Sequence, residues 1–213
     1  MKAIDLTQML SPDMPVYPGT EGPRISDATS IEKDGFAEKL LSMYSHTGTH
    51  IDAPGHMIPR ASTLDQFQVD KFIGTACVVD VPGTPGSDLG LDLLEAQAGR
   101  MEGCQFVLFH TGWDRKWGQA DYFNGFPVLS AEAAGWLCGR GLKGVGFDCI
   151  SVDAVGSTDM AIHRILLGSG LVIVENLCNL ASLPDSTFIF SCLPLRIPDS
   201  DGSPVRAVGM LAD

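Results

Sequence analysis

Short apolar runs dominate this sequence and constrain its fold more than any other feature. They are rich in valine, isoleucine and phenylalanine and are bounded by glycine, proline or aspartate, a pattern typical of β-strands. Helical patterns are fewer, so the sequence predicts an α/β domain with a mixed, strongly curved sheet. The expected strands are Lys2–Leu6, Leu40–Ser45, Gly74–Val81, Gln105–His110, Gly144–Phe147, Leu171–Glu175, Thr187–Leu193 and Val205–Met210. The expected helices are Leu91–Arg100, Ala131–Gly139 with Ser130 as N-cap, Leu64–Val69 and Met160–Leu167.

Length and charge restrict the domain count and the partners. The 213 residues fit a single domain over residues 1–213. A formal net charge of −12 disfavours nucleic acid and anionic membranes, because both require a basic face, and we expect a small-molecule substrate. The six cysteines are scattered singly, which indicates free buried thiols in a reducing cytoplasm. The N-terminus lacks the apolar stretch of a signal peptide, and no apolar run reaches the ~20 residues of a membrane span.

Three of the five histidines fall within eleven residues, and an aspartate lies among them. His46, His50, Asp52 and His56 all have even numbers, so an extended chain would place them on one face. Four residues of straight strand nevertheless span ~13 Å, which is too far for His46 and His50 to bind one ion comfortably. We therefore expect the chain to bend at Gly48, where glycine tolerates unusual backbone angles.

This residue set indicates metal chemistry. Imidazole nitrogen and carboxylate oxygen suit zinc or manganese with one position open for water. Such an ion lowers the pKa of bound water toward ~7 and polarises a carbonyl, and a nearby histidine can then move protons. Pro54 and Gly55 are expected to end any regular structure before His56. Two alternatives remain: a polar loop whose histidines meet solvent, and a purely structural metal site with a closed shell.

The segment His46-x-Gly-Thr-His50-x-Asp52-x-Pro-x-His56 resembles the signature HxGTHxDxPxH of the cyclase family. That family includes bacterial kynurenine formamidases (arylformamidases) and isatin hydrolases. The resemblance covers most of the chain. Further matching stretches are Asp5-Leu-Thr with Met14–Gly19, Gly146–Asp153, His163–Leu167 followed by Val174–Leu177, Pro194–Ile197 and Asp201–Ala207.

The resemblance implies a ligand set. His46, His50 and Asp52 would bind one metal. Asp52 would bridge to a second metal held by His163, and Glu175 would contact both ions. From the residues alone, the favoured interpretation of His163 is a satisfied helix histidine, and that of Glu175 is a surface carboxylate at a strand end. One or two divalent ions per subunit are expected, zinc first and manganese as the alternative.

The resemblance also implies an activity. His56 would donate and accept protons while a metal-held hydroxide attacks an amide carbonyl, as in the conversion of N-formyl-L-kynurenine and water to L-kynurenine and formate. Tyr17 stands where bacterial kynurenine formamidases usually carry a tryptophan, and a tyrosine can still stack on an aryl ring. The alternatives are hydrolysis of a cyclic amide, as in isatin hydrolases, and a non-catalytic metal-binding protein. A structural role is expected for His110.

The fold and assembly that the resemblance implies are equally specific. The fold is a single α/β domain of the swivelling β/β/α type, with a mixed curved sheet flanked by a few helices. The assembly is a homo-oligomer, a dimer or a tetramer, in which the N-terminal segment completes a neighbour's pocket. We expect a cytoplasmic enzyme.

Overall fold

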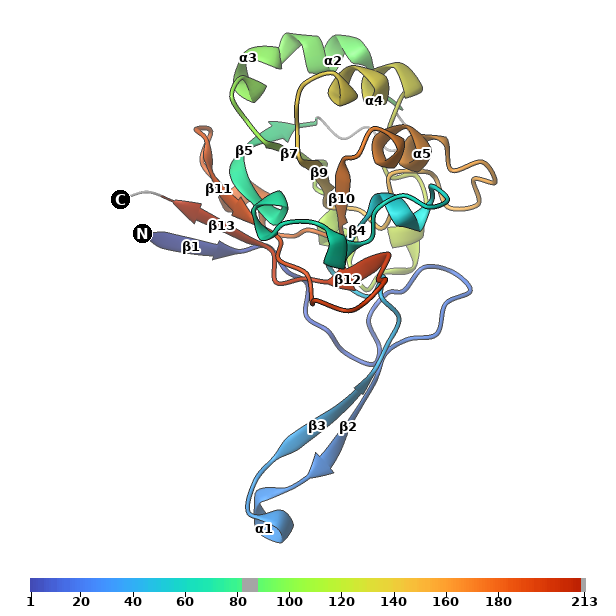
Figure 1. The fold of residues 1–213 in the computed structure, drawn as a ribbon, viewed down its shortest axis with the longest axis vertical. Coiled ribbons are helices and arrows are strands. Elements are labelled where there is room, and N and C mark those ends of the chain that lie inside the picture. Colours follow the sequence, from blue (N-terminus) through green and yellow to red (C-terminus); the bar gives the residue numbers. More distant parts are fainter. Residues whose placement is uncertain (82–87, 212–213) are drawn as a thin grey trace.

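A curled nine-stranded sheet organises the computed structural model, which describes residues 1–81 and 88–211. The strand order is β1-β13-β11-β5-β7-β9-β10-β4-β12 (Figure 1). The four strands β5, β7, β9 and β10 are parallel to one another, and the flanking strands pair antiparallel, so the sheet is mixed as predicted. The strands are β1 (Lys2–Asp5), β4 (His50–Asp52), β5 (Ile73–Asp80), β7 (Phe106–His110), β9 (Gly144–Phe147), β10 (Val172–Glu175), β11 (Phe188–Ser191), β12 (Gly202–Pro204) and β13 (Val208–Leu211).

The parallel strands are joined by helices that cover one face of the sheet (Figure 1). These helices are α2 (Leu91–Ala96), α3 (Ala98–Met101), α4 (Ala131–Cys138) and α5 (Ala161–Gly168). Helix α4 begins as predicted, because the Ser130 side chain accepts a hydrogen bond from the Ala133 N–H at 3.1 Å. Helix α5 packs against α4 and lies over β10, which places its residues above the sheet beside β4.

Strand β7 explains why the central runs are continuously apolar. Val107 and Phe109 pack in the core beneath the helices, whereas Phe106 and Leu108 pack in a second core on the opposite face. All four side chains are fully buried. A strand covered on both faces has no polar side to present, so its sequence does not alternate.

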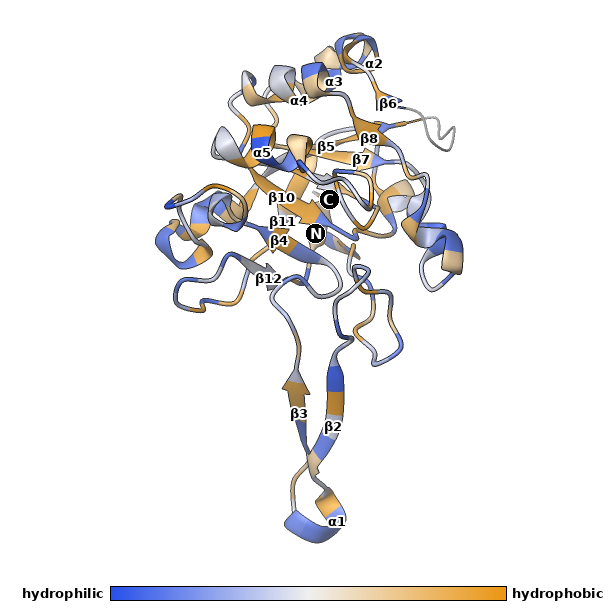
Figure 2. Cartoon of the chain, turned by 90° about the vertical axis from the view of Figure 1, so that its right-hand side faces the viewer, coloured by the Kyte–Doolittle hydropathy of each residue, from blue (hydrophilic) through white to orange (hydrophobic). Residues whose placement is uncertain are grey.

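A hairpin arm, residues 24–42, projects away from the sheet (Figures 1 and 2). It consists of β2 (Arg24–Thr29) paired with β3 (Glu38–Ser42), with the short helix α1 (Ile31–Asp34) at its tip. Every residue of β3 is exposed. The strand expected at Leu40–Ser45 therefore exists in shifted form, but it belongs to the arm rather than to the central sheet.

Several other elements differ from the sequence-based expectation. The helix predicted over Leu64–Val69 is wrong: two 3-10 turns form there, because Phe67 and Gln68 take extended backbone angles between them. The helix predicted over Leu91–Arg100 is interrupted at Gln97. Strands β2, β4 and β12 and a small sheet of β6 with β8 were not foreseen. The remaining elements are β6 (Asp88–Leu89), β8 (Val128–Leu129) and the 3-10 turns η1 (Pro54–His56), η2 (Leu64–Gln66), η3 (Val69–Phe72), η4 (Trp113–Lys116), η5 (Ala120–Phe123) and η6 (Leu180–Ser182).

The cysteines confirm the prediction of free, mostly buried thiols. All six cysteines are free, and five of them are buried. Burial is the main cause that raises the pKa of the Cys77 thiol to about 12, so this group stays protonated. Within the described part of the chain, none of the helices combines the length and the apolar character needed to cross a membrane.

Candidate functional site

Strand β4 carries the centre of the polar cluster. His50 and Asp52 point to one side of the strand, and Ile51 between them is fully buried in the core on the other side. Strand β4 pairs antiparallel with β10 so that His50 lies opposite Glu175. Gly48 has a φ of 67°, a conformation that favours glycine, and the bend there matches the prediction. Residues more than a hundred positions apart are thus neighbours through strand pairing.

The other histidines reach the same place from outside the strand. His46 lies before the bend at Gly48, and His163 lies on α5. His56 ends the 3-10 turn η1, so the expectation that regular structure stops before it is wrong. Proline suits the first position of this turn, and Gly55 lets the Ser62 segment pack closely against it, because a Cβ at Gly55 would lie 3.2 Å from the Ser62 carbonyl oxygen.

One cavity of about 540 Å³ collects all of these side chains. Its wall holds every residue that the sequence singled out for metal binding, proton transfer or substrate binding. The lining residues include Tyr17, Tyr44, Ser45, His46, His50, Asp52, His56, Met57, Ile150, Ser151, Met160, His163, Glu175 and Asp201. The cavity therefore combines ionisable side chains with apolar ones such as Met57, Ile150 and Met160, as small-molecule sites do.

The possible ligand atoms converge in three groups among the described residues; two of them share Asp52, and the third consists of His46, His56 and Asp201. In the first group, Asp52 Oδ1 lies 2.7 Å from His46 Nδ1 and 3.3 Å from His50 Nε2. In the second group, His163 Nε2 lies 3.3 Å from Glu175 Oε1 and 3.9 Å from Asp52 Oδ2. Within each group the ligand atoms lie within 4.8 Å of one another. Asp52 can therefore contribute one oxygen to each of the two groups that share it.

Hydrogen bonds fix which ring nitrogen of each histidine faces the cluster. The Nδ1–H of His50 donates to the Gly48 carbonyl oxygen at 2.8 Å, because a carbonyl oxygen can only accept. The Nδ1–H of His163 donates to Asp153 Oδ2 at 2.7 Å. In both residues Nε2 is left facing carboxylate oxygens, which is the arrangement expected of metal-binding histidines held by an outer partner.

The charges of the clustered side chains indicate which kind of ligand these nitrogen and oxygen donors could bind. Burial alone lowers the pKa of His46 and His163, but the facing carboxylates outweigh burial and raise each pKa to about 10. The pKa of His50 is also raised, and that of Asp52 is lowered chiefly by the two nearest histidines against the effect of burial. Asp52 Oδ2 is buried and has no hydrogen-bond partner among the described residues. Nitrogen and oxygen donors with an unsatisfied buried carboxylate oxygen fit a divalent metal ion.

Two further carboxylates of the site, Asp153 and Asp201, are not indicated by any single-residue pattern in the sequence. Asp153 accepts hydrogen bonds from the backbone N–H groups of Ile162 and His163 at 3.0 Å each, so it caps α5 and orients His163. Asp201 accepts from His46 Nε2 and His56 Nδ1, at 3.0 Å each. Both lie in stretches that resemble the family pattern, and that is the only sequence signal that marks them.

The two remaining candidate residues differ in position. Tyr17 is half-buried, lines the cavity and packs against the core beneath the helices. His110 ends β7, and its Nδ1 lies 2.6 Å from Asp80 Oδ1. His110 does not line the cavity, which is consistent with the structural role expected for it.

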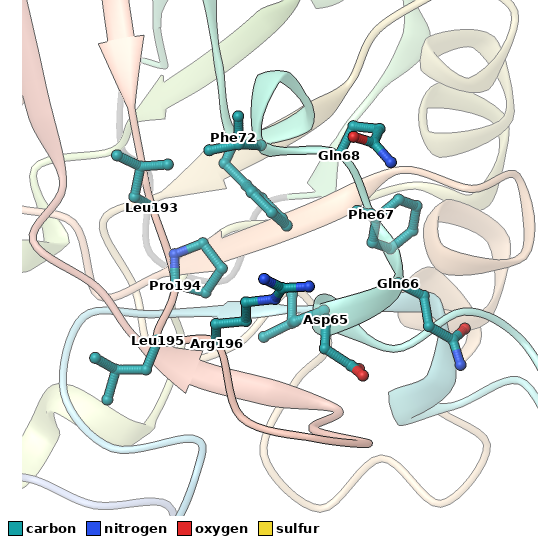
Figure 3. Close-up of a pocket in the computed structure, with 11 residues that line it drawn as sticks. Asp65, Gln66, Phe67, Gln68, Phe72, Leu193, Pro194, Leu195 and Arg196 are labelled. Carbon is teal, nitrogen blue, oxygen red and sulfur yellow. The ribbon is translucent and has the colours of Figure 1, made fainter.

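A second pocket of about 410 Å³ lies between residues 64–72 and residues 193–196 (Figure 3). Its wall carries apolar side chains such as Phe72 and Pro194. Asp65 and Arg196 are its charged side chains, and Gln66 and Gln68 contribute neutral amides. No histidine is among its lining residues. The convergent ionisable groups therefore belong to the larger cavity.

Comparisons with known proteins give consistent matches. The model of the family described as "Putative cyclase" matches residues 4–154. Kynurenine formamidase of Bacillus thuringiensis (strain Al Hakam) is 32% identical over 207 residues, which are 96% of this chain and 95% of that protein. Isatin hydrolase A from Labrenzia aggregata bound to benzyl benzoate has a TM-score of 0.90 at 26% identity, covering 100% of this chain and 94% of that one. An isatin hydrolase bound to the product analogue thioisatinate has a TM-score of 0.91 at 26% identity, covering 100% and 93%.

Proposed function

We propose that this chain, which belongs to the cyclase family, is a metal-dependent hydrolase that cleaves a carbon–nitrogen amide bond. The observation that carries the proposal is the convergence of His46, His50, Asp52, His163 and Glu175 on one cavity. Relatives that act on formamides and on isatin support the same reaction class. A closed structural metal site is disfavoured, because the cluster opens into a cavity of about 540 Å³.

The ligand geometry favours two ions that share one carboxylate. His46, His50 and Asp52 would hold one ion, and Asp52, His163 and Glu175 would hold the other. Zinc is the first choice and manganese the alternative, since both accept imidazole and carboxylate ligands. When bound, such an ion supplies Lewis acidity, which polarises the amide carbonyl and makes water a better nucleophile at neutral pH.

His56 would move the protons of the reaction. Its Nδ1–H donates to Asp201, which leaves Nε2 without that proton and available to accept one from the attacking water. The water oxygen bonds to the carbonyl carbon, the carbon–nitrogen bond breaks, and His56 returns the proton to the leaving nitrogen. The products are a carboxylic acid and an amine, so atoms and charge balance without a further reactant.

An aryl formamide is the substrate that we favour, with N-formyl-L-kynurenine giving L-kynurenine and formate. Tyr17 in the cavity wall can stack on the aryl ring, and Met57, Ile150 and Met160 provide apolar contacts. The second candidate is an isatin-type lactam, supported by the structural similarity to isatin hydrolases. Both substrates place an aryl ring beside the scissile amide bond.

Purified protein loaded with zinc or with manganese would be assayed on both substrates. We expect turnover of the formamide to exceed that of the lactam, and absence of turnover on both would refute the proposed reaction. The His56→Ala variant should keep its metal content and lose about 10²–10⁴-fold in kcat. The matched control is His110→Ala, which removes a histidine outside the cavity and should leave kcat unchanged. Near-normal turnover by the His56 variant would remove this residue from the mechanism.

We also propose that the chain forms a homo-oligomer in which a second copy covers the hairpin arm. The arm exposes Leu40 and Leu41 at 62% and 52%, together with Phe36. An isolated two-stranded hairpin is only marginally stable in water. The body of the same chain offers a further exposed apolar surface at Val69 and Leu195, which line the pocket shown in Figure 3, so a second copy has matching chemistry.

A further inference from the structure

The backbone position of Asp201 is fixed by the pairing of strand β12 with strand β4. Strand β12 starts at the next residue, Gly202, which lies opposite Asp52. The Ala53 N–H donates to the Asp201 carbonyl oxygen at 2.8 Å. The backbone of Asp201 is therefore attached to the strand that carries two of the proposed ligands. Substituting its side chain leaves that attachment in place.

The carboxylate of Asp201 connects two histidines with different proposed roles. Its Oδ2 lies 3.0 Å from His46 Nε2 and 3.0 Å from His56 Nδ1. Its Oδ1 accepts a hydrogen bond from the Ser45 hydroxyl at 3.2 Å. The two imidazole rings are close to each other, with centroids 4.0 Å apart. One carboxylate group thus holds a proposed metal ligand and the proposed proton carrier at the same time.

Gly202, the residue after Asp201, leaves room for the His46 ring because it has no side chain. A Cβ atom at Gly202 would lie 2.5 Å from Cε1 and 2.6 Å from Nε2 of His46. Real Cβ atoms do not approach ring atoms so closely, so the His46 ring requires glycine at this position. Asp201 therefore supplies a hydrogen-bond acceptor for the His46 ring, and Gly202 leaves the space that this ring occupies.

We propose that Asp201 is a positioning residue that holds His46 and His56 in their working tautomers and orientations. The proposal rests on the proposed function of His56 as the proton carrier. It assigns a role to Asp201, which is neither one of the five proposed metal ligands nor the proposed proton carrier.

The chemistry of an ionised carboxylate determines the tautomers. A carboxylate can only accept, so His46 Nε2 and His56 Nδ1 must both carry a hydrogen. His46 is then left to use Nδ1 toward Asp52 and an ion, and His56 is left to use Nε2 toward substrate. Once His56 gains a proton, its positive charge lies against the His46 ring, and the Asp201 charge compensates for it. An asparagine has no negative charge and a single acceptor oxygen, so it supports this arrangement poorly.

The test compares Asp201→Asn and Asp201→Ala with the wild-type protein, all loaded with saturating zinc. The matched control is Asp80→Asn, because Asp80 also faces a histidine Nδ1, that of His110, but lies outside the cavity. Three quantities are measured: kcat and KM on the substrate that the wild type turns over, bound zinc per chain, and the ring tautomers by ¹H–¹⁵N NMR. With five histidines in the chain, the ring signals can be resolved and assigned by substitution.

We expect kcat to fall about 10–100-fold in Asp201→Asn, with KM within about threefold of wild type and zinc per chain unchanged at saturation. The His56 signals should show an Nδ1–H tautomer in wild type and in Asp80→Asn, and a redistribution toward Nε2–H in both Asp201 variants. Unchanged kcat and unchanged tautomers would overturn the proposal. Loss of one zinc per chain at saturation would also overturn it, because Asp201 would then be a metal ligand with His46 and His56. If the wild type lacked amidase activity, the proposed function would fail, and the tautomers in the Asp201 variants would still decide the positioning role.

Discussion

Binding of a divalent ion should release protons from the histidine cluster. In the metal-free protein, His46 Nδ1 faces Asp52, while Nε2 of His50 and of His163 faces carboxylate oxygens of Asp52 and Glu175. The carboxylates overcome the effect of burial and raise the pKa of His46 and His163 to about 10, and they also raise that of His50. Near neutral pH the facing nitrogens of His46 and His163 therefore carry protons at the positions that an ion would take.

The number of released protons follows from the two ligand groups. Filling the group of His46, His50 and Asp52 displaces at least about one proton, that of His46. Filling the group of Asp52, His163 and Glu175 displaces about one more, that of His163. Each displaced proton makes the apparent affinity about tenfold higher per pH unit, or about 1.4 kcal/mol. Between pH 6.5 and 7.5 the overall zinc affinity should therefore rise at least about tenfold for one ion and about 100-fold in total for two.

Isothermal titration calorimetry with zinc, repeated in buffers of different ionisation enthalpy, counts these protons directly. Competition with a chelator over the same pH range measures the affinity independently. The His163→Ala variant should release about one proton fewer, and His110→Gln, outside the cavity, should match wild type. A proton count near zero, or an affinity that does not change with pH, would show that the histidines are neutral and that the charge argument is wrong.

Three further predictions follow from the same structure. Gly202→Ala should weaken zinc binding about 10–100-fold in a chelator competition assay, because its Cβ would collide with the His46 ring, and unchanged affinity would refute the clash. Without metal, the stability contributed by His46 and His163 is fully present below pH 6.5 and is lost as the pH rises toward about 10, since a raised folded-state pKa favours the folded protein at low pH. Urea unfolding of the metal-free protein should show a loss of several kcal/mol over that range, with about 10 kcal/mol as the upper limit set by the two shifts, and a flat profile would contradict it. Replacing Leu40 and Leu41 by serine should lower the molar mass found by light scattering without unfolding the body, whereas an unchanged mass would exclude the arm as the contact.

Local features of the fold were predictable from the sequence, because local patterns encode them. The parallel strands β5, β7, β9 and β10 lie close to the expected runs, since strands buried on both faces must be continuously apolar. The 3-10 turns η2 and η3 were misread as one helix, because periodicity cannot separate a helix from two successive turns with extended residues between them. The hairpin arm was missed as a projecting element, because strand propensity does not reveal whether a strand has a partner sheet.

The segment His46–His56 fixed the centre of the site by itself. The histidines and Asp52 were close in sequence, and the bend that brings His46 back required the glycine that occupies position 48. The family resemblance already indicates that His163 and Glu175 join them, whereas the hydrogen bonds of Asp153 and Asp201 to the site histidines are decided by tertiary structure. Asp201 lies 145 residues after His56, and among 26 acidic residues only the stretches that resemble the family pattern distinguish it and Asp153 from solvated carboxylates. Hydrogen bonds between distant residues depend on strand pairing and helix placement, and these leave no periodic trace in the sequence.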